Sequence, residues 1–397
     1  QVSQYKKQPN CEGGFGVVTR CRNTKNNQIV AIKVNKSDPE ILQQAKHEIF
    51  ILEQLQRLDP DRCNIVEWNG YFLDGERICL NFELLDQSLW DYIGGWNNQG
   101  LPIRELRPIL HQIANALFHL GSVGIVHADL KPANIMVVNR HESPIKVKLI
   151  DFGLACPASA VSPGYRVGTV GYCAPEVMLG IPYDEAIDMW ALGLVAVELA
   201  TGVPLYPGED DYDVLKFIIE TQGQLPDHLL ESEQFQYETN YQSKETRYIK
   251  LKCLDDLEQL LKVRRGPENG QPLFVRLIKQ MLALDANQRI TPSEVLKHPF
   301  FNTGLSRRGE NLVVSQQPPS WKVKDRKNST AVSKTQLNIL KKDMSTPQPT
   351  HLPLKMILKY LKGPFGRSPH GRVFPWRRRL WCCNQVSQYK KQPNCGY

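Results

Sequence analysis

The stretch His127-Ala128-Asp129-Leu130-Lys131-Pro132-Ala133-Asn134 is followed, seventeen residues after its asparagine, by Asp151-Phe152-Gly153. The pattern orders a carboxylate, an ammonium, an amide and, after an apolar run, a second carboxylate. Phosphoryl transfer from ATP requires such a set, because it depends on placing a hydroxyl in line with the γ-phosphate and on neutralising the surrounding charge.

Each of these residues has an expected role. Asp129 would accept or orient the proton of the substrate hydroxyl, and Lys131 would steady the γ-phosphate. Asn134 and Asp151 would hold Mg²⁺ through hard oxygen ligands. Taken singly, such residues are more often loop formers or solvated charges. The complete ordered set outweighs that alternative.

The loop resembles that of the eukaryotic protein kinases. This resemblance implies a bilobal α+β fold that binds ATP and Mg²⁺ between its lobes. The small lobe would be a mainly antiparallel sheet with one helix over residues 11–85, and the larger helical lobe would cover residues 86–301. Residues 302–397 would be a basic, disordered tail.

Composition agrees with a folded body and a distinct tail. The chain has 397 residues and a net charge of +8. Its length and its hydrophobic content of 41% are enough for two domains with a sizeable core. Of its 49 basic and 41 acidic residues, 19 and 3 lie in residues 302–397, so the tail carries +16 and residues 1–301 carry −8.

The sequence also indicates in which cellular compartment we expect the protein. It begins Gln1-Val-Ser-Gln-Tyr-Lys-Lys, with no apolar signal region, and contains no run of eighteen apolar residues, so we expect a soluble protein. Its ten cysteines lack a metal-ligand or disulfide spacing. Reduced thiols in the nucleus or cytoplasm fit best.

Residues 11–34 are typical of two strands with a glycine-rich turn at the start and a polar turn at residues 23–27. Lys33 on the second strand would reach the α- and β-phosphates. Val18 and Ala31 would cover the adenine ring. Backbone N–H groups would close over the phosphates at Glu12, Gly13, Gly14 and Gly16.

A 3.6-residue apolar period predicts a helix at residues 40–57. Glu48 on this helix would pair with Lys33. Taken alone, such a glutamate is more often a solvated surface charge. A second amphipathic helix, residues 103–124, would deliver the catalytic loop. A short strand at residues 147–150 would place Asp151. In the kinase interpretation, the remaining adenine contacts are Phe82 behind the ring, the backbones of Glu83 and Leu85, and Met136 below it.

Residues 154–176 correspond to a kinase activation segment ending in Ala174-Pro175-Glu176. Glu176 would form a buried structural pair with Arg289, and Asp188 would hold the backbone of the catalytic loop. The hydroxyl of Thr169 would bridge Asp129 and Lys131. Lys131 and Thr169 together suggest serine and threonine rather than tyrosine substrates.

The resemblance narrows to the homeodomain-interacting protein kinases over residues 11–301. It rests on residues 107–117, on Ala128 in the catalytic loop, and on residues 245–256 and 290–300. Kinases of this group are nuclear, act on serine and threonine or on tyrosine as well, and modify transcription regulators. We therefore expect protein substrates and a monomer. We expect no direct nucleic-acid binding, because the basic charge of the tail comes with no recognisable nucleic-acid-binding module.

The sequence departs from this family pattern at several positions. Cys11 replaces the first glycine of the phosphate loop, and the polar residues before it suggest a shortened first strand. Ala133 replaces a glutamate that docks basic peptides. Val170 replaces an arginine, and Tyr165 is offset by one residue from the family's autophosphorylated tyrosine. A pseudokinase scaffold without phosphoryl transfer is therefore the alternative.

Ala128 stands where most kinases place an arginine. A phosphate in the activation segment then lacks its usual bidentate partner. We therefore expect activity that does not depend on a phosphate held at this position.

The two ends of the chain share a segment, because residues 1–11 recur without change at residues 385–395. This suggests a tandem gene copy or a misjoined gene model, and it makes residues 1–10 a truncated or misannotated segment. Within the tail, residues 354–362 fit a short basic amphipathic helix. Residues 376–383 fit a nuclear-import or anionic-lipid patch with Cys382 and Cys383 as acylation candidates, against a solvated tail or a mistranslated exon.

Overall fold

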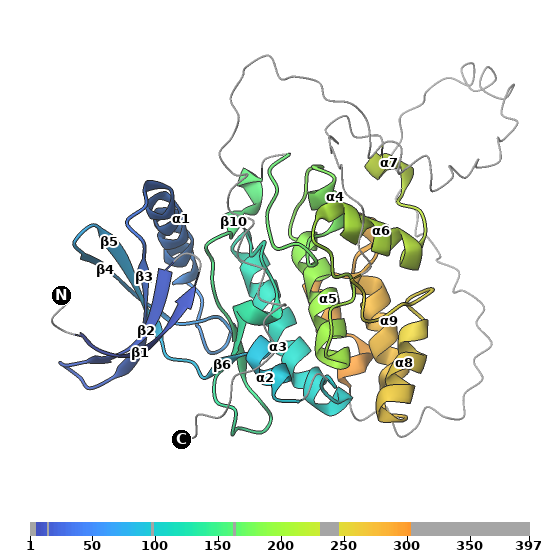
Figure 1. Cartoon of the computed structure of the whole chain (residues 1–397), viewed down its shortest axis with the longest axis horizontal. Helices are drawn as coiled ribbons and strands as arrows, with labels where there is room; N and C mark the ends of the chain where they lie inside the picture. The colour runs from blue at the N-terminus through green and yellow to red at the C-terminus, as the bar shows by residue number, and fades with distance from the viewer. Residues whose placement is uncertain (1–4, 14–15, 97–98, 162–163, 231–245, 303–397) are drawn as a thin grey trace, which may run out of the picture.

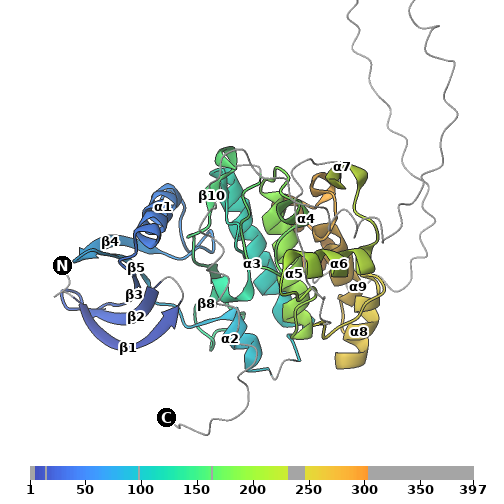
Figure 2. The same cartoon turned by 45° about the horizontal axis from the view of Figure 1, so that its top comes forward.

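The computed structural model describes residues 5–13, 16–96, 99–161, 164–230 and 246–302. Two lobes lie side by side, a sheet with one helix and a larger body of helices (Figures 1 and 2). This is the expected α+β arrangement. The features expected of the tail fall outside the described residues, and so does the second copy of the repeated segment.

The small lobe is built on a five-stranded antiparallel sheet in the order β1-β2-β3-β5-β4. β2 and β3 form the predicted hairpin, with Val18 opposite Lys33. One face of this sheet packs around Cys21, Phe72 and Cys79, and the other contributes to the main core. Its strands are β1 (Tyr5–Gly13), β2 (Gly16–Asn23), β3 (Ile29–Asn35), β4 (Trp68–Asp74) and β5 (Arg77–Glu83).

The expected shortening of the first strand is wrong. β1 has nine residues and begins at Tyr5, six residues before Cys11. It pairs with β2 along its length, with a register shift between Lys7 and Asn10. An edge strand tolerates polar residues, and Pro9 falls inside the shift, where a missing N–H costs little. The kinase fold therefore has its first strand here.

Helix α1 (Pro39–Leu55) covers one face of this sheet, as Figure 1 shows. The carboxylate of Asp38 caps its start by accepting from the N–H groups of Glu40 and Ile41, and Pro39 suits the first helical turn. The predicted apolar stripe is buried, and Glu48 is buried with it. A buried carboxylate in this stripe requires a partner.

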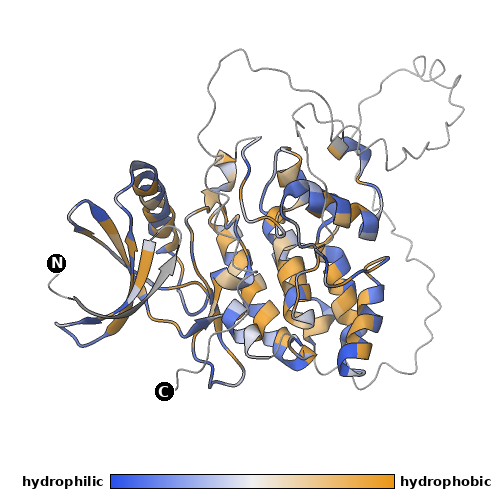
Figure 3. Cartoon of the chain, viewed as in Figure 1, coloured by the Kyte–Doolittle hydropathy of each residue, from blue (hydrophilic) through white to orange (hydrophobic). Residues whose placement is uncertain are grey.

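The large lobe surrounds α5 (Ala186–Thr201), which is buried on every side, and Figure 3 colours it mostly hydrophobic. A helix that is apolar all round belongs in the centre of a core. α3 (Ile103–Ser122) packs against it and presents an apolar stripe. The other helices are α2 (Leu89–Gly94), α4 (Pro175–Met178), α6 (Asp211–Gln222), α7 (Asp227–Leu230), α8 (Asp256–Arg265), α9 (Gln271–Met281) and α10 (Pro292–Val295).

Short strands hold the loops that face the small lobe. β7 (Ile125–Val126) precedes the catalytic loop and pairs with β10 (Cys156–Pro157). β8 (Ile135–Val137) follows that loop and lies between β6 (Gln87–Ser88) and β9 (Val147–Leu149). β9 is the predicted strand that leads into Asp151. Both ends of the catalytic loop are thus attached to the same body.

The predicted pair between Glu176 and Arg289 joins the end of the activation segment to the last helices. Both side chains are buried, and the guanidinium donates to both carboxylate oxygens, with Nη2 to Oε2 at 2.7 Å. Nε also donates to the carbonyl of Ala283 at 2.8 Å. This fork satisfies a charge that would otherwise be costly inside the core.

None of the helices in the described ranges combines the length and the apolar composition that a membrane span requires.

Replacing one member of this pair leaves the other as a buried, uncompensated charge. We expect Glu176→Gln to lower the free energy of unfolding by about 3 kcal/mol, measured by urea denaturation. The matched control is Lys279→Gln, which removes an exposed pair with Asp255 and is expected to cost less than about 1 kcal/mol. Equal losses in the two variants would contradict the structural role of the buried pair.

Candidate active site

The backbone of the catalytic loop is held by the carboxylate of Asp188, near the start of α5. Its two carboxylate oxygens accept the backbone N–H groups of His127 and Ala128, at 2.7 and 2.9 Å. Ala128 has a φ of +63°, a left-handed conformation that is uncommon for a residue with a Cβ. The two hydrogen bonds offset this strain, and they fix the direction in which Asp129 leaves the loop.

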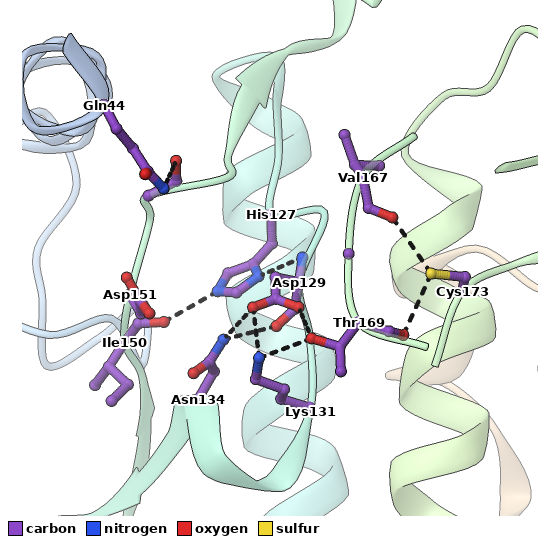
Figure 4. A network of polar contacts seen from close by, with 12 residues as sticks. Gln44, His127, Asp129, Lys131, Asn134, Ile150, Asp151, Val167, Thr169 and Cys173 are labelled. Atoms are coloured by element: carbon purple, nitrogen blue, oxygen red, sulfur yellow. Dashed lines mark hydrogen bonds and ion pairs between the residues drawn. The ribbon is translucent and has the colours of Figure 1, made fainter. Parts of the chain in front are cut away.

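Asp129 lies at the centre of a polar network (Figure 4). Its Oδ2 accepts from Lys131 Nζ at 2.8 Å and from Asn134 Nδ2 at 2.9 Å. Its Oδ1 accepts from Thr169 Oγ1 at 2.6 Å, and Lys131 Nζ also donates to Thr169 Oγ1 at 2.8 Å. The threonine therefore makes the predicted bridge, and three donors hold one carboxylate in place.

Lys33 connects the two lobes. Its Nζ on β3 lies 2.9 Å from both carboxylate oxygens of Glu48 on α1 and 3.0 Å from Oδ1 of Asp151. Burial alone would lower the pKa of Lys33, but the two carboxylates outweigh it and raise the pKa above its ordinary value. Burial would raise the pKa of Asp151, and Lys33 reverses this and lowers it. Both groups are therefore charged at neutral pH.

Two contacts that the sequence analysis missed orient α1 against the start of the activation segment. Gln44 Nε2 donates to the carbonyl of Gly153 at 3.4 Å, and His47 Nε2 donates to the carbonyl of Ala155 at 2.7 Å. Because the acceptors are backbone carbonyls over a hundred residues away, no side-chain pattern marks these contacts. They help to place Glu48 within reach of Lys33.

The aromatic ring of Phe152 also supports the site. It packs edge-to-face against the imidazole of His127, with ring centroids 5.2 Å apart, and both rings are fully buried. His127 Nε2 donates to the carbonyl of Ile150 at 3.1 Å. These contacts join the catalytic loop to the segment that carries Asp151.

Asn134 and Asp151 fit a magnesium ion. Asn134 donates its amide N–H groups to the backbone carbonyl of Asp129 at 2.8 Å and to its carboxylate, so the amide oxygen is directed away from Asp129. Asp151 has a φ of +60° that turns its side chain toward Lys33. Among the described residues, no group of three or more His, Cys, Asp or Glu side chains could hold a metal. A magnesium ion bound with a nucleotide does not need such a group, because phosphate oxygens and water complete its coordination shell.

The predicted adenine contacts line up on one sheet face. Strand pairing sets Val18 opposite Lys33 and Ala31 opposite Phe82, so all four residues share a face. Val18 is 44% exposed, which leaves its side chain accessible to a ligand. Glu83 ends β5, Leu85 is buried in the connection to the large lobe, and Met136 lies on β8.

The phosphate-loop positions are only partly described. Gly14 and the side chain of Glu12 lie outside the described residues, and Gly13 ends β1. At Gly16, an added Cβ would lie 2.1 Å from the carbonyl oxygen of Val34. The close approach of β2 and β3 at this point therefore requires glycine.

The side chain of Glu83 has a role that the sequence did not indicate. Its Oε1 accepts from Lys148 Nζ at 2.6 Å and from the backbone N–H of Glu67 at 2.6 Å. Lys148 Nζ also lies 2.9 Å from Asp61. The buried ammonium of Lys148 thus ties the connection between the lobes to β9.

Glu198 on α5 is a second buried carboxylate beneath the activation segment. Its Oε2 accepts from the hydroxyl of Tyr172 at 2.6 Å. Burial raises the pKa of Glu198 from 4.5 to about 7, even though the Tyr172 hydrogen bond lowers it. Because the folded pKa exceeds the unfolded one, its contribution to stability is complete below pH 4.5 and is lost as the pH rises toward 7.

We therefore expect Glu198→Gln to lose this part of the pH dependence. Relative to the wild type, the variant should gain about 3 kcal/mol in free energy of unfolding between pH 4.5 and pH 8, measured by urea denaturation at both values. Parallel stability curves for the two proteins would contradict the raised pKa.

Known proteins similar to this chain agree with the geometry. Residues 8–301 match the protein kinase domain family. Homeodomain-interacting protein kinase 2 of Mesocricetus auratus is 38% identical over 320 residues, which cover 72% of this chain and 27% of the relative. Kinase 1 of the same group from Mus musculus is also 38% identical, over 72% and 26%. Kinase 4 from Mus musculus is 35% identical over 73% and 53%.

The chain thus spans about a quarter to a half of the length of these relatives. The family match covers the sheet from residue 8 onward, α1 and the helical lobe, including every candidate catalytic residue. The chain therefore belongs to the protein kinase family, and its domain is similar to those of the homeodomain-interacting protein kinases.

Proposed function

We propose that this chain transfers the γ-phosphate of ATP to serine and threonine hydroxyls of proteins. The observation that carries the proposal is the bridge from Thr169 to Asp129 and Lys131, set beside a Lys33 that is paired with both Glu48 and Asp151. These groups suit the alignment of a hydroxyl with a phosphate and the neutralisation of charge around it.

In this proposal, Asp129 accepts the proton of the substrate hydroxyl, and Lys131 steadies the γ-phosphate. Asn134 and Asp151 hold Mg²⁺, which when bound with ATP neutralises charge on the phosphates. Lys33 contacts the α- and β-phosphates, and Glu48 keeps its ammonium directed at them.

The nucleotide-binding residues are likewise proposed. Phe82 would close the back of the adenine pocket, and backbone groups of Glu83 and Leu85 would bond the ring edge. Backbone N–H groups of the phosphate loop would contact the phosphates. The remaining proposed contacts are Val18, Ala31 and Met136 around the ring, and Glu12, Gly13, Gly14 and Gly16 around the phosphates.

Lys131 and Thr169 support serine or threonine as the acceptor. The names of the relatives describe kinases that interact with homeodomain proteins. We therefore propose transcription regulators as substrates, a place in the nucleus or cytoplasm, and a monomeric enzyme.

The direct test is Mg²⁺-dependent transfer of phosphate from ATP to a generic basic protein. We expect turnover in the wild type and a loss of about a thousandfold or more in Asp129→Asn, because the hydroxyl then lacks its proton acceptor. Lys33→Met should lose activity similarly. Equal turnover in all three proteins would remove the enzyme claim and leave a scaffold that binds partners without catalysis.

Nucleotide binding can be measured apart from turnover. Saturating ATP with Mg²⁺ should raise the melting temperature, because a ligand that binds only the folded state stabilises it. Asp151→Asn should weaken the Mg²⁺-dependent part of this shift. A melting temperature that ignores both ATP and Mg²⁺ would contradict the proposed nucleotide site.

The acceptor can be identified on the phosphorylated protein by phosphoamino-acid analysis. We expect phosphoserine and phosphothreonine on added substrates. Phosphotyrosine as the main product on added substrates would contradict the assignment based on Lys131 and Thr169.

A further inference from the structure

Arg166 makes a bidentate contact with Asp211, outside the set of proposed catalytic residues. In the activation segment, its Nε lies 2.7 Å from Oδ2 of Asp211, and its Nη2 lies 2.7 Å from Oδ1. Asp211 is the first residue of α6, and its side chain is 4% exposed, against 34% for Arg166. A fork of this geometry fixes orientation as well as distance.

The same guanidinium reaches the turn that precedes Thr169. Arg166 Nη1 donates to the carbonyl of Gly168 at 3.3 Å. Gly168 has a φ of +80°, and an added Cβ would lie 2.9 Å from the carbonyl oxygen of Ala128. The activation segment therefore passes close against the catalytic loop at this turn, and Arg166 helps to hold it there.

Cys173 secures the other side of the turn. Its thiol donates to the carbonyls of Val167 and Thr169, both at 3.3 Å, as Figure 4 shows. Burial raises the pKa of Cys173 to about 12, so the group stays a neutral donor. A continuous path of contacts thus runs from Asp211 through Arg166 and this turn to the hydroxyl of Thr169, which contacts Asp129.

The charges around the activation segment indicate what this path of contacts does. Ala128, beside Asp129, brings no cation that could bind a phosphate on the segment. Arg166 already directs its fork at a carboxylate built into α6. The acidic partner of Arg166 therefore belongs to the chain itself, and the pair needs no phosphate added to the segment.

We propose that Arg166 is a positioning residue: its pair with Asp211 holds the activation segment in the arrangement that accepts a protein substrate, without phosphorylation. This rests on the proposed kinase function. The pair acts through the turn that carries Thr169. It therefore affects the binding of the protein substrate and the rate of phosphate transfer, and it does not affect the affinity for ATP.

The test compares phosphatase-treated wild type with Arg166→Gln, Arg166→Lys and a control on the same helix. Wild-type enzyme should keep its turnover after phosphatase treatment. In Arg166→Gln, kcat/KM for the protein substrate should fall by about ten- to a hundredfold, because the turn that places Thr169 loses its anchor. The KM for ATP should stay unchanged. Arg166→Lys should lie between the two, since an ammonium keeps the charge and loses the fork.

The matched control is Glu220→Gln, which removes a pair with Arg247 at the far end of α6. Its atoms lie 2.8 Å apart, and the side chains of Glu220 and Arg247 are 32% and 9% exposed. It should leave both constants at wild-type values. If the control and Arg166→Gln lose the same activity, the effect belongs to the stability of α6 and the proposal fails. Wild-type turnover that disappears on phosphatase treatment also overturns it.

A second measurement does not depend on turnover. Hydrogen exchange of the amides between residues 166 and 173 should accelerate in Arg166→Gln and stay unchanged in Glu220→Gln, because only the first variant releases the turn. Unchanged exchange in Arg166→Gln would overturn the proposal even in an active enzyme. If the wild type transfers no phosphate but exchange responds as expected, the proposed function fails while the anchoring role of Arg166 stands.

Discussion

The buried ammonium of Lys33 is the interaction on which the rest of the site depends. It belongs to a strand of the small lobe, Glu48 to the helix that covers that sheet, and Asp151 to the large lobe. A buried charge must be paired, so the three elements cannot separate without leaving a carboxylate or an ammonium uncompensated. The separation of the lobes and the orientation of α1 are thus coupled to the position of the Asp151 carboxylate.

The large lobe supplies the complementary constraint through Asp188. Because α5 is buried on every side, the carboxylate of Asp188 in its first turn has a fixed position. Its hydrogen bonds can therefore hold the catalytic loop in a strained conformation. The loop holds Ala128 at a positive φ, and Asp129 then meets Lys131, Asn134 and Thr169. Thr169 comes from the activation segment, so the arrangement of that segment decides whether Asp129 is correctly held. The pair of Arg166 with Asp211 extends this dependence to α6.

The sequence predicted the parts of the site that follow from residue order. Asp129, Lys131, Asn134 and Asp151 lie within 23 residues, and local strand and helix patterns carry Lys33 and Glu48 into place. Contacts with backbone carbonyls, such as those of Gln44 and His47, leave no such signal. The pair between Arg166 and Asp211 spans 45 residues without a periodic pattern. The sequence does not predict the full first strand, because an edge strand tolerates polar residues and a proline within a register shift.

A crystal structure with Mg²⁺ and a non-hydrolysable ATP analogue tests the central claim most directly. The account predicts a metal about 2.1 Å from the amide oxygen of Asn134 and from a carboxylate oxygen of Asp151. Lys33 should keep its pair with Glu48 and contact the α- or β-phosphate. A nucleotide bound elsewhere, or a bound nucleotide with Lys33 turned away from both Glu48 and the phosphates, would contradict it.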